Sequence, residues 1–323
     1  MSDTLGLLDL IICRIPGLKA REKIELVKKF DREDDFSALS DKEINNILGK
    51  THKAWKMGEV KAMAEEDALE ARKSGISWVS FREKTYPPLL REIFDPPVLL
   101  FYRGTLPNPE KPLVAVVGTR KPSSQAARRA YVLGRELGLA GIPVVSGLAL
   151  GIDSMAHRGN IEGRAATIAV LGSGPDLVYP SSNRDLARKI LQNGGIILSE
   201  YPPGTGPFKS HFPARNRIIS ALARGLVIVE APEKSGALIT AAFALEQGKD
   251  LWVDGNFVSS PGSAGTGRLA EDGAKQLSSA EDILSEWNLD SHSLKKKEKD
   301  TAQSIEVNLA ASMAEYLDIR IEG

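Results

Sequence analysis

Apolar residues recur at helical spacing through the first 75 residues of the chain. Leucines and isoleucines in 5–12 lie three or four residues apart, and the same spacing resumes over 24–30 after a turn at 15–18. Such spacing places one apolar stripe on each helix, and the stripe is buried against a neighbouring helix. A longer stretch rich in Ala, Glu and Lys predicts a helix over 51–74. We therefore expect a helical N-terminal domain over residues 1–75.

A different pattern begins after residue 75. Short apolar runs over 76–79 and 98–102, separated by Pro-rich turns, predict strands that extend a sheet. From residue 113 the chain repeats strand, Gly-rich turn and helix, and its strands are continuous apolar runs instead of alternating ones. Continuous runs indicate strands that are covered on both faces, as in a parallel sheet with crossover helices. The predicted strands are 114–117, 143–145, 167–171, 195–198, 226–229 and 251–253.

These patterns predict an α/β protein with a mostly parallel sheet and a helical domain at its N-terminus. The expected domains are 1–75, 76–290 and a short C-terminal tail, 291–323. The tail begins with a Lys-rich linker, followed by a possible amphipathic helix through Ile305, Leu309, Met313 and Leu317. In a parallel sheet of this kind, ligands collect at the carboxyl ends of the strands.

Composition and charge limit the cellular compartments and the binding partners that we expect for this protein. The 323 residues carry no net charge, yet 111–224 hold 15 basic and 6 acidic side chains, whereas 225–290 hold 4 and 11. A basic stretch suggests a polyanion partner, although solvated Arg-rich helix surfaces would look the same. One cysteine and four histidines offer no disulfide and no zinc-ligand spacing. We expect a cytoplasmic protein without a membrane segment, a metal or another cofactor.

Three predicted strand ends carry candidate site residues, and two of them have the equipment to bind phosphate. Gly118, Thr119, Arg120 and Lys121 follow the strand 114–117 and precede a helix, where backbone N–H groups, a hydroxyl and a guanidinium converge. A structural turn is the alternative, since neither a dinucleotide fingerprint nor a nucleotide-triphosphate loop is present. Lys234, Ser235 and Gly236 form a similar turn after the strand 226–229.

The second of these strand ends carries small residues and a possible acid/base pair. Ser146 and Gly147 follow the strand 143–145, and Asp153 and His157 lie four apart on the helix that comes next. A catalytic pair is conceivable, but an Asp that orients a packed His is commoner, and no nucleophile stands nearby in the sequence.

The segment 208–217 is the densest candidate for nucleic-acid binding. It combines cations with aromatic rings ahead of an expected helix at Ile218, and its candidate residues are Lys209, Phe212, Arg215, Asn216 and Arg217. Single-stranded nucleic acid is held in this way, because a ring stacks on any base while cations follow the phosphates. A helix-entry loop whose arginines neutralise nearby carboxylates is the alternative.

Five ordered blocks of sequence resemble the DNA-processing protein A (DprA/Smf) family. The blocks are 114–123, 144–157, 198–202, 212–219 and 235–240. The resemblance implies an extended Rossmann-like domain and an N-terminal domain of sterile-alpha-motif or helix-hairpin-helix type. Two other segments depart from the family pattern: Asp254-Gly255 stands where the family usually has a Pro-Gly turn, and 265–270 stands where it usually has a Gly-x-Asn-x-Leu-Ile segment.

The resemblance implies a non-enzymatic mediator of recombination. Such a protein binds single-stranded DNA, forms a homodimer, protects incoming DNA and helps to load RecA during natural transformation. Arg120 would hold phosphate, Phe212 would stack on a base, and Lys209, Arg215 and Arg217 would line the pocket. The alternative is a nucleotide-processing enzyme of phosphoribohydrolase type, with Glu200 or Glu230 as its acid/base and Gly262–Thr266 as a faint echo of that family's signature.

Overall fold

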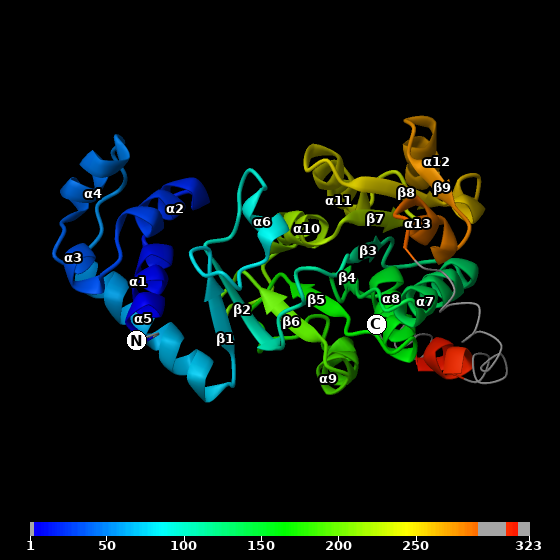
Figure 1. Ribbon diagram of the computed structural model, residues 1–323, viewed down its shortest axis with the longest axis horizontal. Coiled ribbons are helices and arrows are strands. Elements are labelled where there is room, and N and C mark those ends of the chain that lie inside the picture. The colour runs from blue at the N-terminus through cyan, green and yellow to red at the C-terminus, as the bar shows by residue number, and fades with distance from the viewer. Residues whose placement is uncertain (1–2, 290–307, 316–323) are drawn as a thin grey trace. The chain divides into compact units, whose positions relative to one another are not determined.

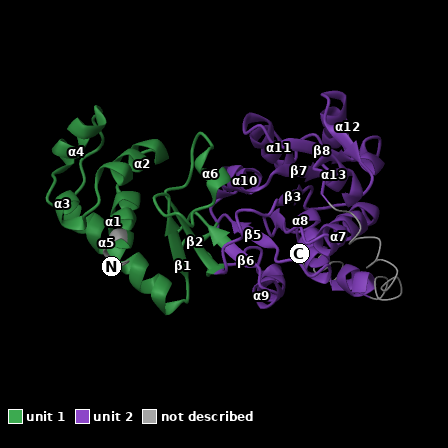
Figure 2. Cartoon of the chain, in the orientation of Figure 1, with its two compact units in different colours: residues 1–103, 173–177, 198–206 green, residues 104–172, 178–197, 207–323 purple. Residues whose placement is uncertain are grey.

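The chain forms two compact units, each described here by itself. The structure is a computed structural model that describes residues 3–289 and 308–315 (Figure 1). The first unit comprises Met1–Arg103, Ser173–Leu177 and Leu198–Gly206, and the second comprises Gly104–Gly172, Val178–Ile197 and Pro207–Gly323 (Figure 2). The predicted division into 1–75, 76–290 and 291–323 stays a prediction.

The first unit is a bundle of helices with a two-stranded hairpin. Its helices are α1 (Asp3–Arg14), α2 (Ala20–Lys29), α3 (Glu33–Ser37), α4 (Asp41–Leu48), α5 (Met57–Lys73) and α6 (Pro88–Arg91). The strands β1 (Ser77–Ser80) and β2 (Leu99–Gly104) pair antiparallel. The apolar stripes predicted from the sequence meet in one core, where Leu8, Ile12, Val27, Phe36 and Phe101 are buried. The predicted N-terminal helices are confirmed.

The second unit is built on a parallel sheet. Its strands are β3 (Val114–Val117), β4 (Val144–Ser146), β5 (Ile168–Leu171), β7 (Gly225–Ile228), β8 (Asp250–Asp254) and β9 (Lys275–Leu277). They lie in the order β5-β4-β3-β7-β8-β9, and each strand pairs with its neighbours in parallel. The strand β6 (Ile196–Ser199) begins in this unit. The predicted α/β class with a mostly parallel sheet is confirmed.

Helices connect the strands of the second unit, as the crossover pattern predicts. They are α7 (Ser124–Leu139), α8 (Ile152–Glu162), α9 (Arg184–Gln192), α10 (His211–Leu222), α11 (Gly236–Glu246), α12 (Ala264–Glu271) and α13 (Ala280–Glu286), with short 3-10 turns η1 (Ser181–Asn183) and η2 (Gly255–Phe257). Helices α7 and α8 approach closely because glycines face the opposing backbone. A Cβ at Gly138 would lie 2.7 Å from the Asn160 carbonyl oxygen, and one at Gly159 would overlap the Tyr131 carbonyl.

The structure corrects several predicted boundaries. The helix expected over 51–74 begins only at Met57, and α10 begins at His211 instead of Ile218. The strand β9 was not predicted, because its three residues are mostly exposed and carry no apolar run. In the C-terminal tail, residues 308–315 are helical and Leu309 is buried in the core of the second unit. Ile305 and Leu317, two positions of the predicted tail helix, lie outside the described residues.

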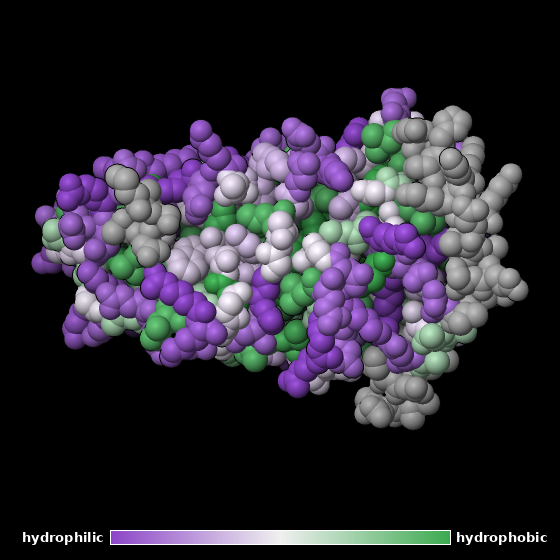
Figure 3. All heavy atoms as spheres, turned by 60° about the horizontal axis from the view of Figure 1, so that its bottom comes forward, coloured by the Kyte–Doolittle hydropathy of each residue, from purple (hydrophilic) through white to green (hydrophobic). Residues whose placement is uncertain are grey.

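Polar side chains cover most of the face drawn in Figure 3, with hydrophobic residues in scattered patches. Within residues 3–289 and 308–315, no helix combines the length and apolar character needed to cross a bilayer.

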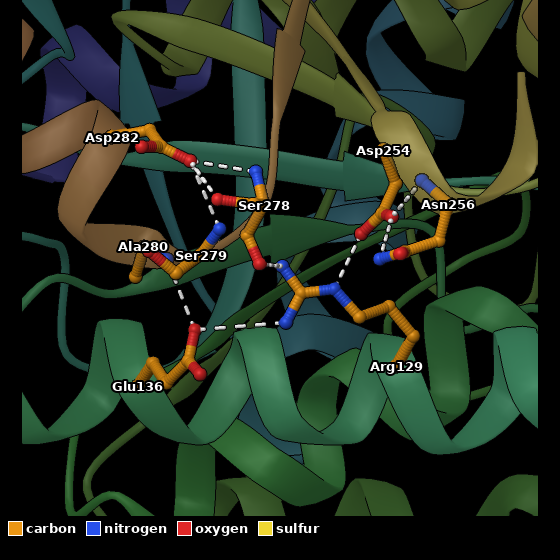
Figure 4. Close-up of polar contacts among 8 residues, drawn as sticks. All are labelled: Arg129, Glu136, Asp254, Asn256, Ser278, Ser279, Ala280 and Asp282. Atoms are coloured by element: carbon orange, nitrogen blue, oxygen red, sulfur yellow. Dashed lines mark hydrogen bonds and ion pairs between the residues drawn. The ribbon is translucent and has the colours of Figure 1, made fainter.

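A polar network joins α7 to the segments that follow β8 and β9 (Figure 4). Arg129 on α7 pairs with the buried Asp254 carboxylate and donates to the Ser278 carbonyl oxygen at 2.8 Å. Glu136, also on α7, accepts from the backbone N–H of Ala280 at 3.0 Å, at the start of α13. Both partners of the Arg129–Asp254 ion pair belong to the second unit.

Candidate nucleic-acid interface

A cavity of about 720 Å³ opens at the carboxyl ends of β3 and β7, entirely within the second unit. The first turns of α10 and α11 border it, so their positive dipole ends face this space. Its lining includes ten of the predicted site residues: Gly118, Thr119, Arg120, Lys209, Phe212, Arg215, Asn216, Lys234, Ser235 and Gly236. The sheet topology therefore brings together segments that lie about a hundred residues apart in the sequence.

The loop after β3 is fixed by Glu230, which follows β7. The Thr119 N–H donates to the Glu230 carbonyl oxygen at 2.7 Å, and the Ser123 N–H donates to the Glu230 carboxylate at 2.7 Å. A side chain at Gly118 would meet the same carbonyl at 2.8 Å, so only glycine fits there. Glu230 is itself 4% exposed. With the loop held in this way, the exposed Arg120 faces the cavity.

Two aromatic rings line the cavity beside Arg120. The Phe212 and Tyr179 ring centroids are 5.6 Å apart, and the Arg120 guanidinium lies 5.5 Å from the Phe212 centroid. Phe212 is half-buried and packs against Gly172, whereas Tyr179 is 48% exposed. Sequence reasoning missed Tyr179. Its signal was an aromatic residue in the loop that leaves β5, at the edge of the sheet where ligands collect.

Arg215 is a buried part of the cavity floor. It is 4% exposed and donates to the carbonyl oxygens of Gly147, at 2.8 Å, and Val170. The Gly147 carbonyl directly follows β4, and the Val170 carbonyl belongs to β5. The guanidinium therefore connects the ends of these two strands. Asp153 lies near this charge and accepts from the Gly147 N–H at 3.0 Å. Burial raises the pKa of Asp153, while Arg215 and the backbone donors oppose that rise.

His157 is a core residue in this structure. Its Nδ1 lies 2.7 Å from the Thr167 hydroxyl, which donates to the Val144 carbonyl oxygen at 2.8 Å. The hydroxyl must therefore accept from Nδ1–H, so Nδ1 carries a proton. Burial, aided by the Arg215 charge, lowers the pKa of His157 to about 3. The side chain is fully buried and its residue is not among those that line the cavity, so the geometry favours the packing interpretation over an acid/base pair.

The earlier start of α10 decides which side chains of 208–217 reach the cavity. Phe212, Asn216 and Ile219 lie at i, i+4 and i+7 and share the face that lines it. Arg217 lies one position beyond Asn216, about 100° around the helix, and is 7% exposed. Its guanidinium donates to the Ala214 carbonyl oxygen at 3.1 Å. Lys209 precedes the helix and lines the cavity.

The turn before α11 also lines the cavity. The Ser235 hydroxyl accepts from the Ala237 N–H at 3.2 Å and caps the helix. The Asn216 side chain donates to the Gly236 carbonyl oxygen at 3.3 Å, so α10 and this turn are joined. Lys234 is exposed and lines the cavity.

Four predicted site residues do not line the cavity. Lys121 is exposed, and its N–H donates to the Thr119 hydroxyl at 3.2 Å. The buried Ser146 donates to the Val116 carbonyl oxygen at 2.7 Å, and Gly147 lies against Arg215, where a Cβ would sit 2.5 Å from the guanidinium. Arg217 is the fourth.

The cavity combines cations, rings and hydroxyls, which suits a ligand made of phosphates and bases. Among the described residues, no cluster of His, Cys, Asp and Glu could hold a metal ion. Thr266 belongs to the segment 262–266, which weakly resembles the phosphoribohydrolase signature. Its hydroxyl accepts from the Ala231 N–H at 2.8 Å and so connects α12 to the loop after β7. Glu200 belongs to the first unit and is not among the lining residues.

Comparisons with known proteins find similar sequences over most of the chain. The family model described as DNA recombination-mediator protein A matches residues 77–288. The DNA processing protein DprA of Bacillus subtilis is 41% identical over 290 residues, which cover 86% of this chain and 94% of that protein. The DprA of Streptococcus pneumoniae is 43% identical over 210 residues, covering 64% and 73%.

Two solved structures resemble the chain. The X-ray structure of DprA from Streptococcus pneumoniae matches with a TM-score of 0.69 and 36% identity, over 88% of this chain and 94% of that one. A structure of the Helicobacter pylori protein, which describes its single-stranded DNA binding mode, matches with a TM-score of 0.58 and 30% identity, over 66% and 97%. This chain therefore belongs to the DNA recombination-mediator protein A family.

Proposed function

We propose that this protein mediates DNA recombination by binding single-stranded DNA in the cavity of the second unit. The observation that carries the proposal is the meeting of Arg120, Lys209 and Lys234 with the rings of Phe212 and Tyr179 in one cavity. Cations neutralise the phosphates without regard to sequence, and each ring accepts any base. The Helicobacter pylori relative, which binds single-stranded DNA, supports the same role.

The lining residues take different parts in this proposal. Arg120, Lys209 and Lys234 pair with phosphates, while Phe212 and Tyr179 stack on bases for about 1–3 kcal/mol each. The sugar-phosphate backbone contacts the backbone N–H groups and polar side chains of Gly118, Thr119, Asn216, Ser235 and Gly236. Arg215 positions the strand ends beneath them, because its guanidinium donates to the backbone carbonyls of Gly147 and Val170.

Salt dependence tests the phosphate contacts. The affinity for a single-stranded oligonucleotide should fall as the salt concentration rises. The slope of log K against log salt should become shallower by roughly 0.7 for each phosphate contact that is removed. Arg120→Ala should flatten the slope by about that amount and weaken binding. Fluorescence anisotropy over a salt series, with single- and double-stranded oligonucleotides of the same sequence, measures both quantities.

Arg268→Ala is the matched control, because Arg268 is an exposed arginine of the second unit that pairs with Asp272 and does not line the cavity. Its salt slope should equal that of the wild type. Binding that is independent of salt, or equal flattening by both substitutions, would count against phosphate contacts in the cavity.

We infer that the protein is not an enzyme. The acidic candidates of the phosphoribohydrolase alternative have other surroundings, since Glu230 holds the loop after β3 and Glu200 does not line the cavity. Incubation with nucleoside monophosphates should release no free base. Base release that Glu200→Gln or Glu230→Gln abolishes would establish the enzymatic alternative instead.

The wider role follows from the family resemblance. We propose a cytoplasmic homodimer that protects incoming DNA and helps to load RecA during natural transformation. Light scattering coupled to gel filtration tests the dimer, and a monomer at all concentrations would refute it. RecA filament formation on coated single strands, with and without this protein, tests the loading role.

A further inference from the structure

Exposed apolar side chains gather at the mouth of the cavity. Among the described residues, eight large hydrophobic side chains are exposed, and two of them, Tyr179 and Ile239, line the cavity. A third, Phe208, lies between Pro207 and Lys209, which are both lining residues. A polar cavity with an apolar rim indicates a ligand that carries flat apolar groups beyond the part held inside.

The Phe208 ring is held in place and yet remains open to solvent. Its centroid lies 5.1 Å from that of His211, at an interplanar angle of 73°, so an edge contact fixes the ring. The His211 N–H donates to the Phe208 carbonyl oxygen at 3.0 Å, and His211 Nδ1 lies 3.1 Å from the Gly172 carbonyl oxygen. Phe208 is nevertheless 60% exposed. A preorganised, uncovered ring loses little conformational entropy when a base stacks on it.

Rings and cations alternate along the sequence of this segment. Phe208 is followed by Lys209, and then by Phe212 with Tyr179 beside it. Single-stranded nucleic acid has the same alternation, because a phosphate separates each base from the next. A base on Phe212 and Tyr179 would therefore be followed by a phosphate at Lys209 and a second base at Phe208.

We propose that Phe208 forms a second base-stacking subsite at the rim of the cavity, so that the protein binds at least two successive nucleotides of a single strand. The subsite rests on the proposed function, since it extends the same strand out of the same cavity. It makes the length of the oligonucleotide, and not only its charge, a determinant of affinity.

A length series tests the subsite. Thymidine monophosphate and oligothymidylates of two to six nucleotides compete against a labelled single strand, and each gives an inhibition constant. In the wild type, affinity should rise steeply beyond one nucleotide. Phe208→Ala should reduce that rise by about tenfold, within the range that one stacking contact gives. Phe208→Tyr keeps a ring and should restore it.

Phe94→Ala is the control, because Phe94 is a 66% exposed phenylalanine of the first unit and does not line the cavity. It should leave every inhibition constant unchanged. An unchanged rise in Phe208→Ala, or an equal loss for the mononucleotide and the longer strands, overturns the subsite while leaving the cavity proposal in place. A wild-type protein that binds no single strand overturns the proposed function and this subsite together.

Discussion

Some arginines of the basic stretch 111–224 stabilise the fold, whereas Arg120 is exposed at the cavity. Arg129 pairs with Asp254, Arg158 pairs with Glu315, and the Arg224 guanidinium lies 4.5 Å from the Trp287 ring centroid. Arg215 is bound to backbone carbonyls, and Arg120 alone of these five is exposed at the cavity. The charge asymmetry of the sequence therefore overestimates the binding surface, because most of these guanidinium groups serve the fold.

His157 gives a prediction about pH. Its pKa is lowered in the folded protein from 6.5 to about 3, so between these values the unfolded chain binds the proton more tightly. The free energy of unfolding should therefore fall as pH drops below 6.5, by up to about 1.4 kcal/mol per pH unit from this group.

Urea unfolding of the wild type and His157→Phe over this pH range isolates the effect. The variant cannot titrate at this position, and the Thr167 hydroxyl keeps its bond to the Val144 carbonyl. We expect a shallower loss of stability with acid in the variant. Parallel pH profiles for the two proteins would show that His157 is protonated in the folded state as readily as in the unfolded chain.

At the scale of elements, sequence patterns predicted the strands better than the helix ends. Continuous apolar runs marked β3, β5 and β7, because a strand covered on both faces tolerates few polar residues. The start of α10 was missed, since the aromatic and basic residues of 208–217 look like a loop. A helix starting at His211 would have predicted Phe212, Asn216 and Ile219 on one face and Arg217 off it.

The ion pair between Arg129 and Asp254 connects α7 to the end of β8, and its removal should lower the stability of the protein. The Asp254 side chain is fully buried and that of Arg129 is 12% exposed. Asp254→Asn removes the fully buried carboxylate and leaves Glu136, 3.8 Å away, as the remaining acidic partner of Arg129. Loss of one member of a buried ion pair typically costs up to about 3–5 kcal/mol. We expect a lower free energy of unfolding by roughly this amount, measured by chemical denaturation.

Asp272→Asn is the matched control for that measurement. Its carboxylate lies 3.9 Å from Arg268, and both side chains are about 70% exposed. Solvent screens such pairs, so the midpoint of unfolding should not move. Equal midpoints for both variants would mean that the Asp254 pair contributes no more than a surface ion pair.

For the whole molecule, a parallel sheet explains how distant segments come to share one site. The carboxyl ends of β3, β5 and β7 bring together Arg120, Tyr179 and Lys234, with α10 beside them. The sequence could predict this edge, since parallel strands point the same way. It could not predict which side chains turn inward, because that depends on where each helix begins and on buried partners such as the carbonyls beneath Arg215.

Photo-cross-linking tests the central claim most directly. An iodouracil-substituted single-stranded oligonucleotide, irradiated with the full-length protein and analysed by mass spectrometry, reports which aromatic side chains lie against the bases. We expect cross-links at Tyr179, Phe212 and Phe208, and their loss when unlabelled single strand competes. Cross-links confined to the first unit, with none at these three rings, would contradict single-stranded DNA binding in this cavity.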